Sequence, residues 1–305
     1  VVSALPCPHV YANVLMTGMM MFGTKLVLHK IFDPTKVLQD IKVHKATLFD
    51  GVPTMYMFML NSPAFSEADL SSLKRCYVGG QTMPIATMLA VEKGFGVPLY
   101  ELWGMTEIAG LGSTHPLYGE NKHGSIGCAI PYCELRIADV DDVSKTMPRG
   151  EVGELMVRGP IVMIGYFGDE EKTRQTLEPD GWLHSGDLGT MDNDGCVYIV
   201  DRKKDMILTG GYNVYPAEIE RVLAEHPDVA LAAVGKQPDE MKGEIAKAYV
   251  VLKEGMTLTE QNMIDFCRKS LAAYKCPRKI QFVDDVPKTS TGKIMRRELY
   301  TLDND

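Results

Sequence analysis

The stretch RCYVGGQTMPIATMLAVEKGFGVPLYELWG, Arg75 to Gly104, contains two short apolar runs separated by a helical pattern. The runs RCYVGG and VPLYELWG have the length and composition of buried strands. The segment Pro84 to Lys93 opens with a proline, which a helix accepts near its first position because the missing N–H would have no partner there. Strand, helix and strand in this order predict a parallel α/β unit.

The same alternation precedes this stretch. Two further strand–helix pairs lie upstream, made of the strands KLVLH and ATLFDG and the helices Pro34 to His44 and Pro53 to Leu60. Both of these helices also open with proline. The region from Lys25 to about Thr106 therefore predicts a parallel sheet with helices packed against it.

From about Gly124 to Val200 the hydrophobic pattern changes to a period of two. The pieces ELRIAD, GELMVRG and GCVYIVD alternate in this way, and MDNDG is a turn signal of the hairpin type. This part of the chain predicts a mostly antiparallel, β-rich subdomain.

After Asp201 the pattern changes again. A helix from Pro216 to His226 carries Ile219, Val222 and Leu223 on one face. Two strands (VALAAVG and AKAYVVL), a helix from about Thr259 to Tyr274 and a strand (KIQFV) follow. We predict an α/β fold with a large domain over residues 1–201 (α/β over 1–115, β-rich over 116–201), a hinge at 202–205 and a small α+β domain over 202–305.

Composition excludes several classes of protein. The chain has 305 residues and a formal net charge of −8, so a basic nucleic-acid-binding face is not expected. Seven cysteines are scattered without a C-x-x-C pair, which favours a reducing, cytoplasmic setting over a disulfide framework or a zinc knuckle. The apolar run Val14 to Gly23 is too short for a membrane span. Because the chain starts with Val and not Met, we expect a piece of a longer protein.

The segment KTSTGKIMRR, Lys288 to Arg297, has the composition of a phosphate-binding loop. It is not a Walker A loop, because Pro287 stands where the first glycine is required and Ile294 stands where Ser or Thr is required. Taken alone, the composition of this stretch favours a solvated basic tail over a phosphate-binding loop.

Seven stretches, in order, resemble those of the adenylate-forming acyl-CoA synthetases, a family that includes coumarate and fatty-acid CoA ligases. They are LPCPHVY, YVGGQTMP, LWGMTEIAG, GELMVRGPIVMIGYF, GWLHSGDLG, YIVDRKKDMILTGGYNVYPAEIE and VPKTSTGKIMRREL. The resemblance covers nearly the whole chain, but only the later part of a family member. It implies that an acid attacks the α-phosphate of ATP to give an acyl-adenylate, and that the thiol of coenzyme A then displaces AMP.

The resemblance also implies roles for single residues around the nucleotide. Thr106 donates to phosphate and Glu107 holds Mg²⁺, although both also suit a helix start with Thr106 as N-cap. Asp187, which the stretch GWLHSGD is expected to place after a turn, is a ribose ligand, since one carboxylate accepts hydrogen bonds from two vicinal hydroxyls. The other implied nucleotide contacts are Gly80, Gln81 and Thr82 beside the adenine, Trp103 stacked on it where tyrosine is commoner, Arg202 on the ribose and Lys293 on the phosphate.

Lys293 lies on the small domain, which the resemblance describes as turning about half a revolution between the two half-reactions at a hinge that matches Lys204. Before the turn, Lys293 bridges the acid carboxylate and the α-phosphate, and Asn213 assists. After it, Gly210, Gly211 and Tyr212 line the channel for coenzyme A. Leu208 occupies a place that is often lysine in relatives, so that accessory contact is not expected.

For the acyl pocket the resemblance implies His9, Tyr11, Gly79, Gly104, Ala109 and Gly110. A lone histidine beside an apolar run is also an ordinary core residue, and the 19 methionines suit a plain core as well as a variable pocket. The segments around the pocket contain no Arg or Lys, which disfavours a dicarboxylate. We expect a medium- or long-chain fatty acid first and an aryl acid next.

The expected substrates are a carboxylic acid, ATP with Mg²⁺, and coenzyme A, with no prosthetic group and with a homodimer possible. The Ser/Thr/Gly-rich phosphate loop that family members carry near their N-terminus is not found here, so turnover by these 305 residues alone is in doubt. Two other classes stay open: an adenylation module that loads a carrier protein, and a nucleotide-binding protein without catalysis.

Overall fold

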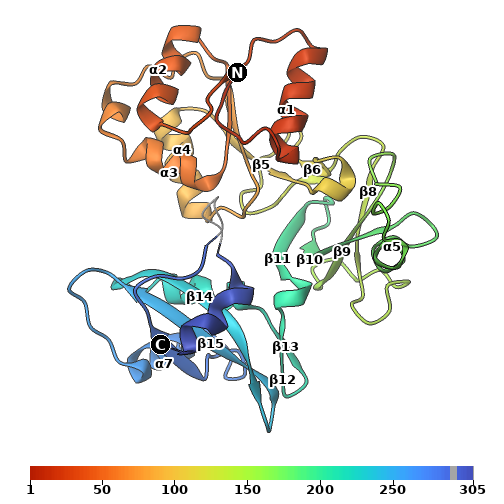
Figure 1. Cartoon of the computed structure of the whole chain (residues 1–305), viewed down its shortest axis with the longest axis vertical. Coiled ribbons are helices and arrows are strands. Elements are labelled where there is room, and N and C mark those ends of the chain that lie inside the picture. Colours follow the sequence, from red (N-terminus) through yellow and green to blue (C-terminus); the bar gives the residue numbers. More distant parts are fainter. Residues whose placement is uncertain (289–293, 305) are drawn as a thin grey trace. The chain divides into compact units, whose positions relative to one another are not determined.

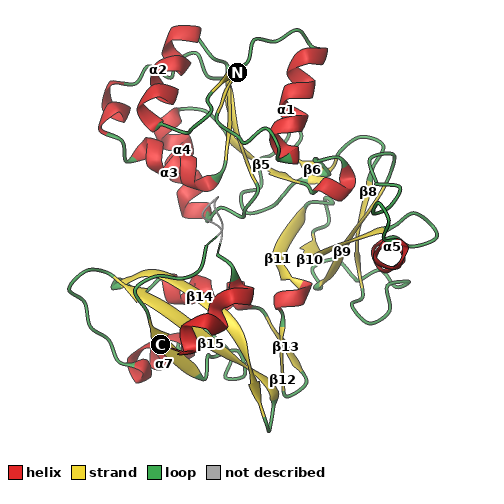
Figure 2. Ribbon diagram, viewed as in Figure 1, coloured by secondary structure: helices red, strands yellow, loops and turns green. Residues whose placement is uncertain are grey.

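The computed structural model describes residues 1–288 and 294–304, which divide into two compact units (Figures 1 and 2). The first unit contains Val1–Ser185 and Gly189–Ile199, and the second contains Gly186–Leu188 and Val200–Asp305. Each unit has its own hydrophobic core and is described by itself.

The first unit contains a sheet with the strand order β2-β1-β3-β4-β5-β6-β7. Pairing is parallel from β2 through β5 and antiparallel for β5–β6 and β6–β7. The strands are β1 (Val2–Ser3), β2 (Val27–Leu28), β3 (Leu48–Gly51), β4 (Arg75–Gly79), β5 (Leu99–Trp103), β6 (Ser113–Thr114) and β7 (Cys128–Ala129).

Helices cover the parallel strands. They are α1 (Val10–Met21), α2 (Pro34–His44), α3 (Pro53–Leu60) and α4 (Ile85–Phe95). Proline stands in the first turn of α2 and α3, as predicted, whereas Pro84 is the N-cap residue of α4. No helix was predicted for α1, because its residues are apolar on nearly every face and give no helical period.

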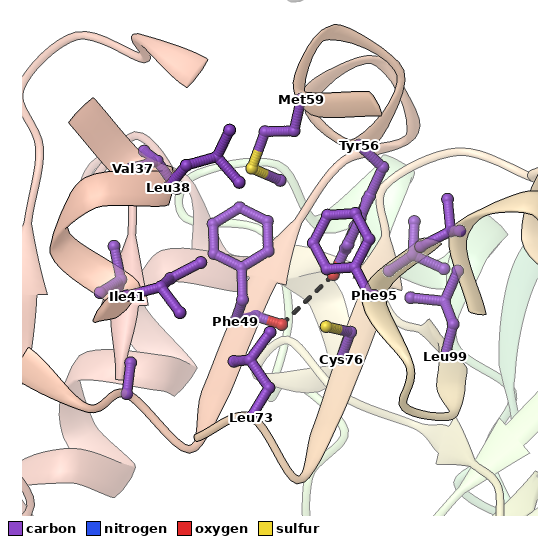
Figure 3. Packing of buried hydrophobic residues seen from close by; sticks show 14 of the residues in the cluster. Val37, Leu38, Ile41, Phe49, Tyr56, Met59, Leu73, Cys76, Phe95 and Leu99 are labelled. Atoms are coloured by element: carbon purple, nitrogen blue, oxygen red, sulfur yellow. Dashed lines mark hydrogen bonds between the residues drawn. The ribbon is translucent and has the colours of Figure 1, made fainter. Parts of the chain in front are cut away.

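One face of the sheet carries the main core (Figure 3). Phe49, Cys76 and Val78 alternate along β3 and β4 with residues that point to the other face, and they pack against α2, α3 and α4. The Tyr56 hydroxyl donates to the carbonyl oxygen of Tyr77 at 2.6 Å, so the one polar tip in this cluster is satisfied.

A second sheet has the order β11-β10-β9-β8. Its strands are β8 (Glu134–Ala138), β9 (Gly153–Arg158), β10 (Leu183–Met191) and β11 (Val197–Arg202), and a short helix, α5, spans Glu170–Thr176. The pair β8–β9 is antiparallel. Asp187 was predicted to follow a turn, which is wrong, because it lies inside β10 next to Gly186, whose φ of 70° glycine adopts without ending the strand.

The second unit has a sheet in which β13, β12, β15 and β14 are neighbours in that order and β16 pairs parallel with β15. Its elements are β12 (Ile207–Thr209), β13 (Tyr212–Val214), α6 (Pro216–Ala224), β14 (Val229–Asp239), β15 (Gly243–Leu252), α7 (Glu260–Arg268) and β16 (Lys279–Phe282). Ile219, Val222 and Leu223 of α6 are buried together, as their spacing indicated.

The fold class predicted from sequence is confirmed, with a sheet containing parallel strands, a β-rich part and a separate α+β unit. One helix was drawn too long: α7 ends at Arg268 and not near Tyr274, and Thr259 caps it. Short 3-10 turns complete the described residues: Pro63–Glu67, Thr106–Ile108, Lys203–Asp205 and Arg296–Asn304.

Candidate active site

A cavity of about 450 Å³ lies between α1 and the carboxyl-end portions of β3, β4 and β5. Its apolar lining includes Val10, Val14, Leu15, Met19, Leu48, Leu102 and Leu111. This is the edge of a parallel sheet at which α/β proteins bind ligands. The cavity has the size and the mostly apolar wall of a small-molecule site.

Five of the six residues predicted for the acyl pocket line this cavity: His9, Tyr11, Gly79, Gly104 and Gly110. The sixth, Ala109, is exposed, has a left-handed backbone (φ 55°) and is not among the lining residues.

His9 and Tyr11 hold the start of α1. His9 is the N-cap residue, and its Nδ1 accepts a hydrogen bond from the backbone N–H of Tyr11 at 3.2 Å. The Tyr11 hydroxyl reaches across to β3 and donates to Asp50 Oδ1 at 3.2 Å. His9 is therefore a capping residue whose ring also borders the cavity.

Glycine at two positions keeps the cavity open. A Cβ on Gly104 would lie 1.9 Å from the carbonyl oxygen of Gly110, so only glycine fits between β5 and this loop. Gly110 has a φ of 109°, and a Cβ there would lie 2.4 Å from Val14 Cγ2 on α1. A side chain at either position would push the loop away from the sheet.

The predicted adenine segments follow adjacent parallel strands. Gly80, Gln81 and Thr82 follow β4, and Trp103 ends β5. Because carboxyl ends of parallel strands meet at one edge, the two segments lie at the same edge of the sheet. Gly80 and Trp103 also line the cavity, so the predicted nucleotide segments border the predicted acyl pocket.

Thr106 and Glu107 begin a 3-10 turn after β5, and the N-cap is Met105. The alternative in which Thr106 caps the helix is therefore wrong. Thr106 is exposed. Glu107 Oε1 accepts a hydrogen bond from the Tyr166 hydroxyl at 2.8 Å, and its backbone oxygen accepts from Met163 N at 2.8 Å.

The Glu107 carboxylate fits the Mg²⁺ that the family implies. Among the described residues no group of three or more His, Cys, Asp and Glu side chains forms a metal cluster. Mg²⁺ in nucleotide enzymes commonly takes only one or two protein carboxylates and completes its shell with phosphates and water. A single carboxylate fixed by one hydrogen bond satisfies that requirement.

Asp187 and Arg202, both predicted to contact ribose, lie together in the second unit. Arg202 Nε is 2.7 Å from Asp187 Oδ1, and the aspartate side chain is buried whereas the arginine is partly exposed. Lys204, predicted as the hinge, is exposed in the 3-10 turn Lys203–Asp205 directly after β11.

The predicted coenzyme A segment is a tight β-hairpin. Gly210 and Gly211, with φ of 55° and 83°, form the two-residue loop between β12 and β13. Positive φ at both positions is the signature of a type I′ turn. Tyr212 stacks on Tyr274 with ring centroids 4.6 Å apart, and Asn213 is exposed opposite Leu208.

Lys293 lies outside the described residues. Nearby Arg296 is described, and it forms ion pairs with Asp201 at 2.8 Å, Asp205 at 3.3 Å and Glu220 at 2.6 Å. These contacts connect Arg296 to β11, to the 3-10 turn Lys203–Asp205 and to α6.

Sequence reasoning missed two residues of the site, Asp50 and Tyr166. Asp50 lines the cavity, and burial raises its pKa to about 7 although the Tyr11 hydrogen bond opposes the shift. Asp50 could have been found from the sequence, because it is a lone aspartate inside the apolar strand ATLFDG. Burial, followed by the hydrogen bond to Glu107, raises the pKa of Tyr166. No local pattern joins residues so far apart in sequence.

Within the described residues, the structure contains no helix with the length and apolar character that crossing a bilayer requires.

The family model for AMP-binding enzymes matches residues 1–167, and the model for the C-terminal domain of AMP-binding enzymes matches residues 218–293. The chain belongs to the AMP-binding enzyme family, which confirms the resemblance found in the sequence.

Particular relatives are similar over nearly the whole chain. A long-chain-fatty-acid–CoA ligase of Bacillus subtilis is 40% identical over 300 residues, covering 98% of this chain and 53% of the relative. The ATP-bound structure of MatB from Rhodopseudomonas palustris has a TM-score of 0.91 at 33% identity, covering 100% of this chain and 60% of that one. The structure of the O-succinylbenzoate coenzyme A synthetase MenE of Bacillus subtilis, in complex with ATP and magnesium ion, has a TM-score of 0.86 at 34% identity. The match covers 98% of this chain and 61% of that one. The chain thus spans about half the length of the curated relatives it matches.

Proposed function

We propose that this chain carries the acid-binding and adenylation elements of an AMP-forming acid–CoA ligase. The observation that carries the proposal is the cavity whose walls contain both predicted acyl-pocket residues and residues of the predicted nucleotide segments, Gly80 and Trp103. A ligand in this cavity has an apolar wall for its tail and the nucleotide segments beside its other end.

The acid enters with its tail between α1 and the sheet. Apart from the Tyr11 hydroxyl, the residues of α1 that line the cavity are apolar, and Gly79, Gly104 and Gly110 leave the backbone open to close approach. The acid carboxylate then lies toward Trp103 and Thr106, where it attacks the α-phosphate of ATP. Holding the acid carboxylate next to the α-phosphate accounts for most of the rate. Without the protein, the two anions repel each other and must lose entropy to meet.

Around the nucleotide, Trp103 stacks on adenine, Thr106 donates to phosphate, and Asp187 and Arg202 hold the ribose. Glu107 would hold Mg²⁺, which neutralises phosphate charge when bound. Tyr166 keeps the Glu107 carboxylate in one orientation through its 2.8 Å hydrogen bond. A fixed carboxylate loses less entropy when the metal binds.

Lys293 and Asn213 assist adenylation, and the hairpin at Gly210 and Gly211 receives coenzyme A after a rotation about Lys204. The best-supported acids are medium- or long-chain fatty acids, in line with the uncharged and mostly apolar lining that α1 contributes. We further propose a cytoplasmic enzyme, for which a homodimer is compatible.

The test is release of AMP from ATP and Mg²⁺ with a panel of fatty and aryl acids, with and without coenzyme A, on the full reading frame that contains this chain. We expect AMP release that requires an acid. Lys293→Ala should lower the rate of adenylation by 10²-fold or more, on the order of the loss of one positioned charge at a reacting group.

Lys288→Ala is the matched control, since it removes a nearby lysine that pairs with Asp285. The rate of adenylation of Lys288→Ala should stay within about twofold of that of the unmodified protein, because losing a surface ion pair has little effect. ATP turnover that ignores the acid, or an equal loss in both variants, would contradict the proposal.

A further inference from the structure

Two thiols from distant parts of the sequence lie in contact in the first unit. Cys128 Sγ, on β7, is 3.2 Å from the Sγ atom of Cys196, the residue directly before β11. The two residues are 68 positions apart in sequence. Of the cysteines in the described part of the chain, these are the one pair whose sulfurs meet within hydrogen-bonding distance.

Backbone hydrogen bonds hold the segments that carry these thiols together. The N–H of Ile126 donates to the carbonyl oxygen of Val197 at 2.8 Å, and the N–H of Val197 donates to that of Gly127 at 2.9 Å. The Cys128 thiol also lies 3.8 Å from the carbonyl oxygen of Asp194, in the turn before β11. The sulfurs of a disulfide are about 2.0 Å apart, so bonding this pair needs an approach of roughly 1 Å.

The two thiols differ in their access to solvent. Cys128 is partly exposed, whereas Cys196 is buried. Burial, followed by the hydrogen bond with Cys128, raises the pKa of the Cys196 thiol, so the Cys196 thiolate is scarce near neutral pH. An oxidant in solution therefore meets Cys128 first, and the Cys196 sulfur lies beside whatever forms there.

We propose that Cys128 and Cys196 form a reversible disulfide when a small-molecule disulfide, such as oxidised glutathione, accumulates. The Cys128 thiolate attacks one sulfur of that oxidant, which gives a mixed disulfide on Cys128 and releases one thiolate. The Cys196 sulfur then attacks the Cys128 sulfur, its proton passes to the departing thiolate, and the protein disulfide closes. Two protein thiols are oxidised and one small disulfide is reduced to two thiols, without any part in acid activation.

The disulfide joins β7 to β11 across a long loop. Such a bond removes conformational freedom from the unfolded chain, so the oxidised first unit should unfold less readily. We expect the thermal midpoint of this unit, followed by the fluorescence of Trp103 and Trp182, to rise by about 5 °C or more on oxidation. The rise should disappear when the protein is reduced again.

The experiment equilibrates the reduced 305-residue chain, and separately the full reading frame, with mixtures of glutathione and oxidised glutathione. After alkylation and tryptic digestion without reductant, mass spectrometry identifies a cross-link between the peptides 123–136 and 175–202, which contain Cys128 and Cys196. We expect at least half of each protein to carry the cross-link at about 1 mM of each form, since two fixed thiols act at a far higher effective concentration.

Variants assign the cross-link to this pair. Cys133 lies on the same tryptic peptide as Cys128, so Cys133→Ser is the matched control and should keep both the cross-link and the rise in midpoint. Cys128→Ser, at a partly exposed position, should lose both, and so should Cys196→Ser.

Four results would overturn the inference. They are proteins that stay reduced in this mixture, a cross-link that survives in Cys128→Ser, a cross-link that forms in the 305-residue chain but not in the full reading frame, and a cross-link that leaves the unfolding midpoint unchanged. Acid activation is measured separately, by release of AMP, and none of these results bears on it.

Discussion

A single hydrogen bond, from Tyr166 to Glu107, orients the carboxylate that is predicted to hold Mg²⁺. The two side chains lie 59 positions apart in sequence and meet through one hydrogen bond of 2.8 Å. Lys172 Nζ lies 4.2 Å from the centre of the Tyr166 ring, which further restrains it. A hydroxyl with a raised pKa stays protonated near neutral pH and remains a donor.

Tyr166→Phe removes that donor without changing the packing of the ring. We expect the apparent affinity for Mg²⁺ in the presence of ATP to fall by roughly tenfold, the usual cost of losing a partner of a metal ligand. Binding of Mn²⁺ with ATP, followed by electron paramagnetic resonance, measures this without turnover. Tyr118→Phe, at an exposed tyrosine, is the control, and an equal change in both variants would contradict the role of Tyr166.

Gly104→Ala tests the close approach of the loop after β5. The new Cβ would lie 1.9 Å from the Gly110 carbonyl oxygen, and we expect a loss of about 1–3 kcal/mol in the free energy of unfolding. Gly18→Ala is the control: a Cβ there meets nothing within 4 Å, and alanine should stabilise α1 by up to about 1 kcal/mol. Denaturant unfolding followed by tryptophan fluorescence reports on this unit, which holds both Trp103 and Trp182. Changes of the same sign in both variants would contradict the packing described.

Among the helices and strands, the best-predicted ones have a residue in the sequence that marks where they begin or a clear apolar face. Proline in the first turn placed α2 and α3, and the apolar face of α6 followed from its spacing. The helix α1 was missed because its sequence, VYANVLMTGMMM, has no polar face. The strand β1 has two residues, which is too few to produce a periodic pattern.

In the candidate site, too, residues within short sequence motifs were predicted, whereas residues that depend on contacts between distant segments were missed. Motifs identified seven residues that line the cavity, five for the acyl pocket and two for the nucleotide, because each motif is a short run of sequence. Asp50 and Tyr166 depend on pairing between distant segments, which periodicity does not carry. The stretch GWLHSGD was also misread: it was expected to place Asp187 after a turn, whereas Gly186 and Asp187 lie inside the continuous strand β10.

His184 on β10 should make the stability of the first unit depend on pH. Its ring nitrogens contact Glu154 at 3.2 Å and Glu178 at 2.9 Å, and the hydrogen bond to Glu154, with that to Glu178, raises the pKa of His184 above its usual 6.5 despite burial. The protonated form is favoured in the folded state. Its stabilisation is complete below the unfolded pKa and is lost as the pH rises through the higher folded value.

The check is the unfolding midpoint of the unmodified chain and of His184→Gln, followed by tryptophan fluorescence between about pH 5 and pH 9. The difference between the two should be largest on the acid side and should shrink as the pH rises past the ordinary histidine pKa. A difference that does not change with pH, or that grows toward alkaline pH, would contradict this account.

At the scale of the whole molecule, the two units carry different parts of the proposed reaction. The cavity and the Glu107 turn belong to the first unit, and the hairpin at Gly210 and Gly211 belongs to the second. Asp187 and Arg202, which are predicted to contact the ribose, both fall in the second unit. The division of labour between a large and a small mobile domain stays a prediction.

The most direct test of the central claim is detection of the acyl-CoA product by mass spectrometry, with AMP quantified in the same reaction, on the full reading frame supplied with an acid, ATP, Mg²⁺ and coenzyme A. We expect thioester and AMP to form in equal amounts, only when all substrates are present, and we expect Lys293→Ala to abolish both. AMP without thioester, or thioester accompanied by ADP, would contradict an AMP-forming acid–CoA ligase.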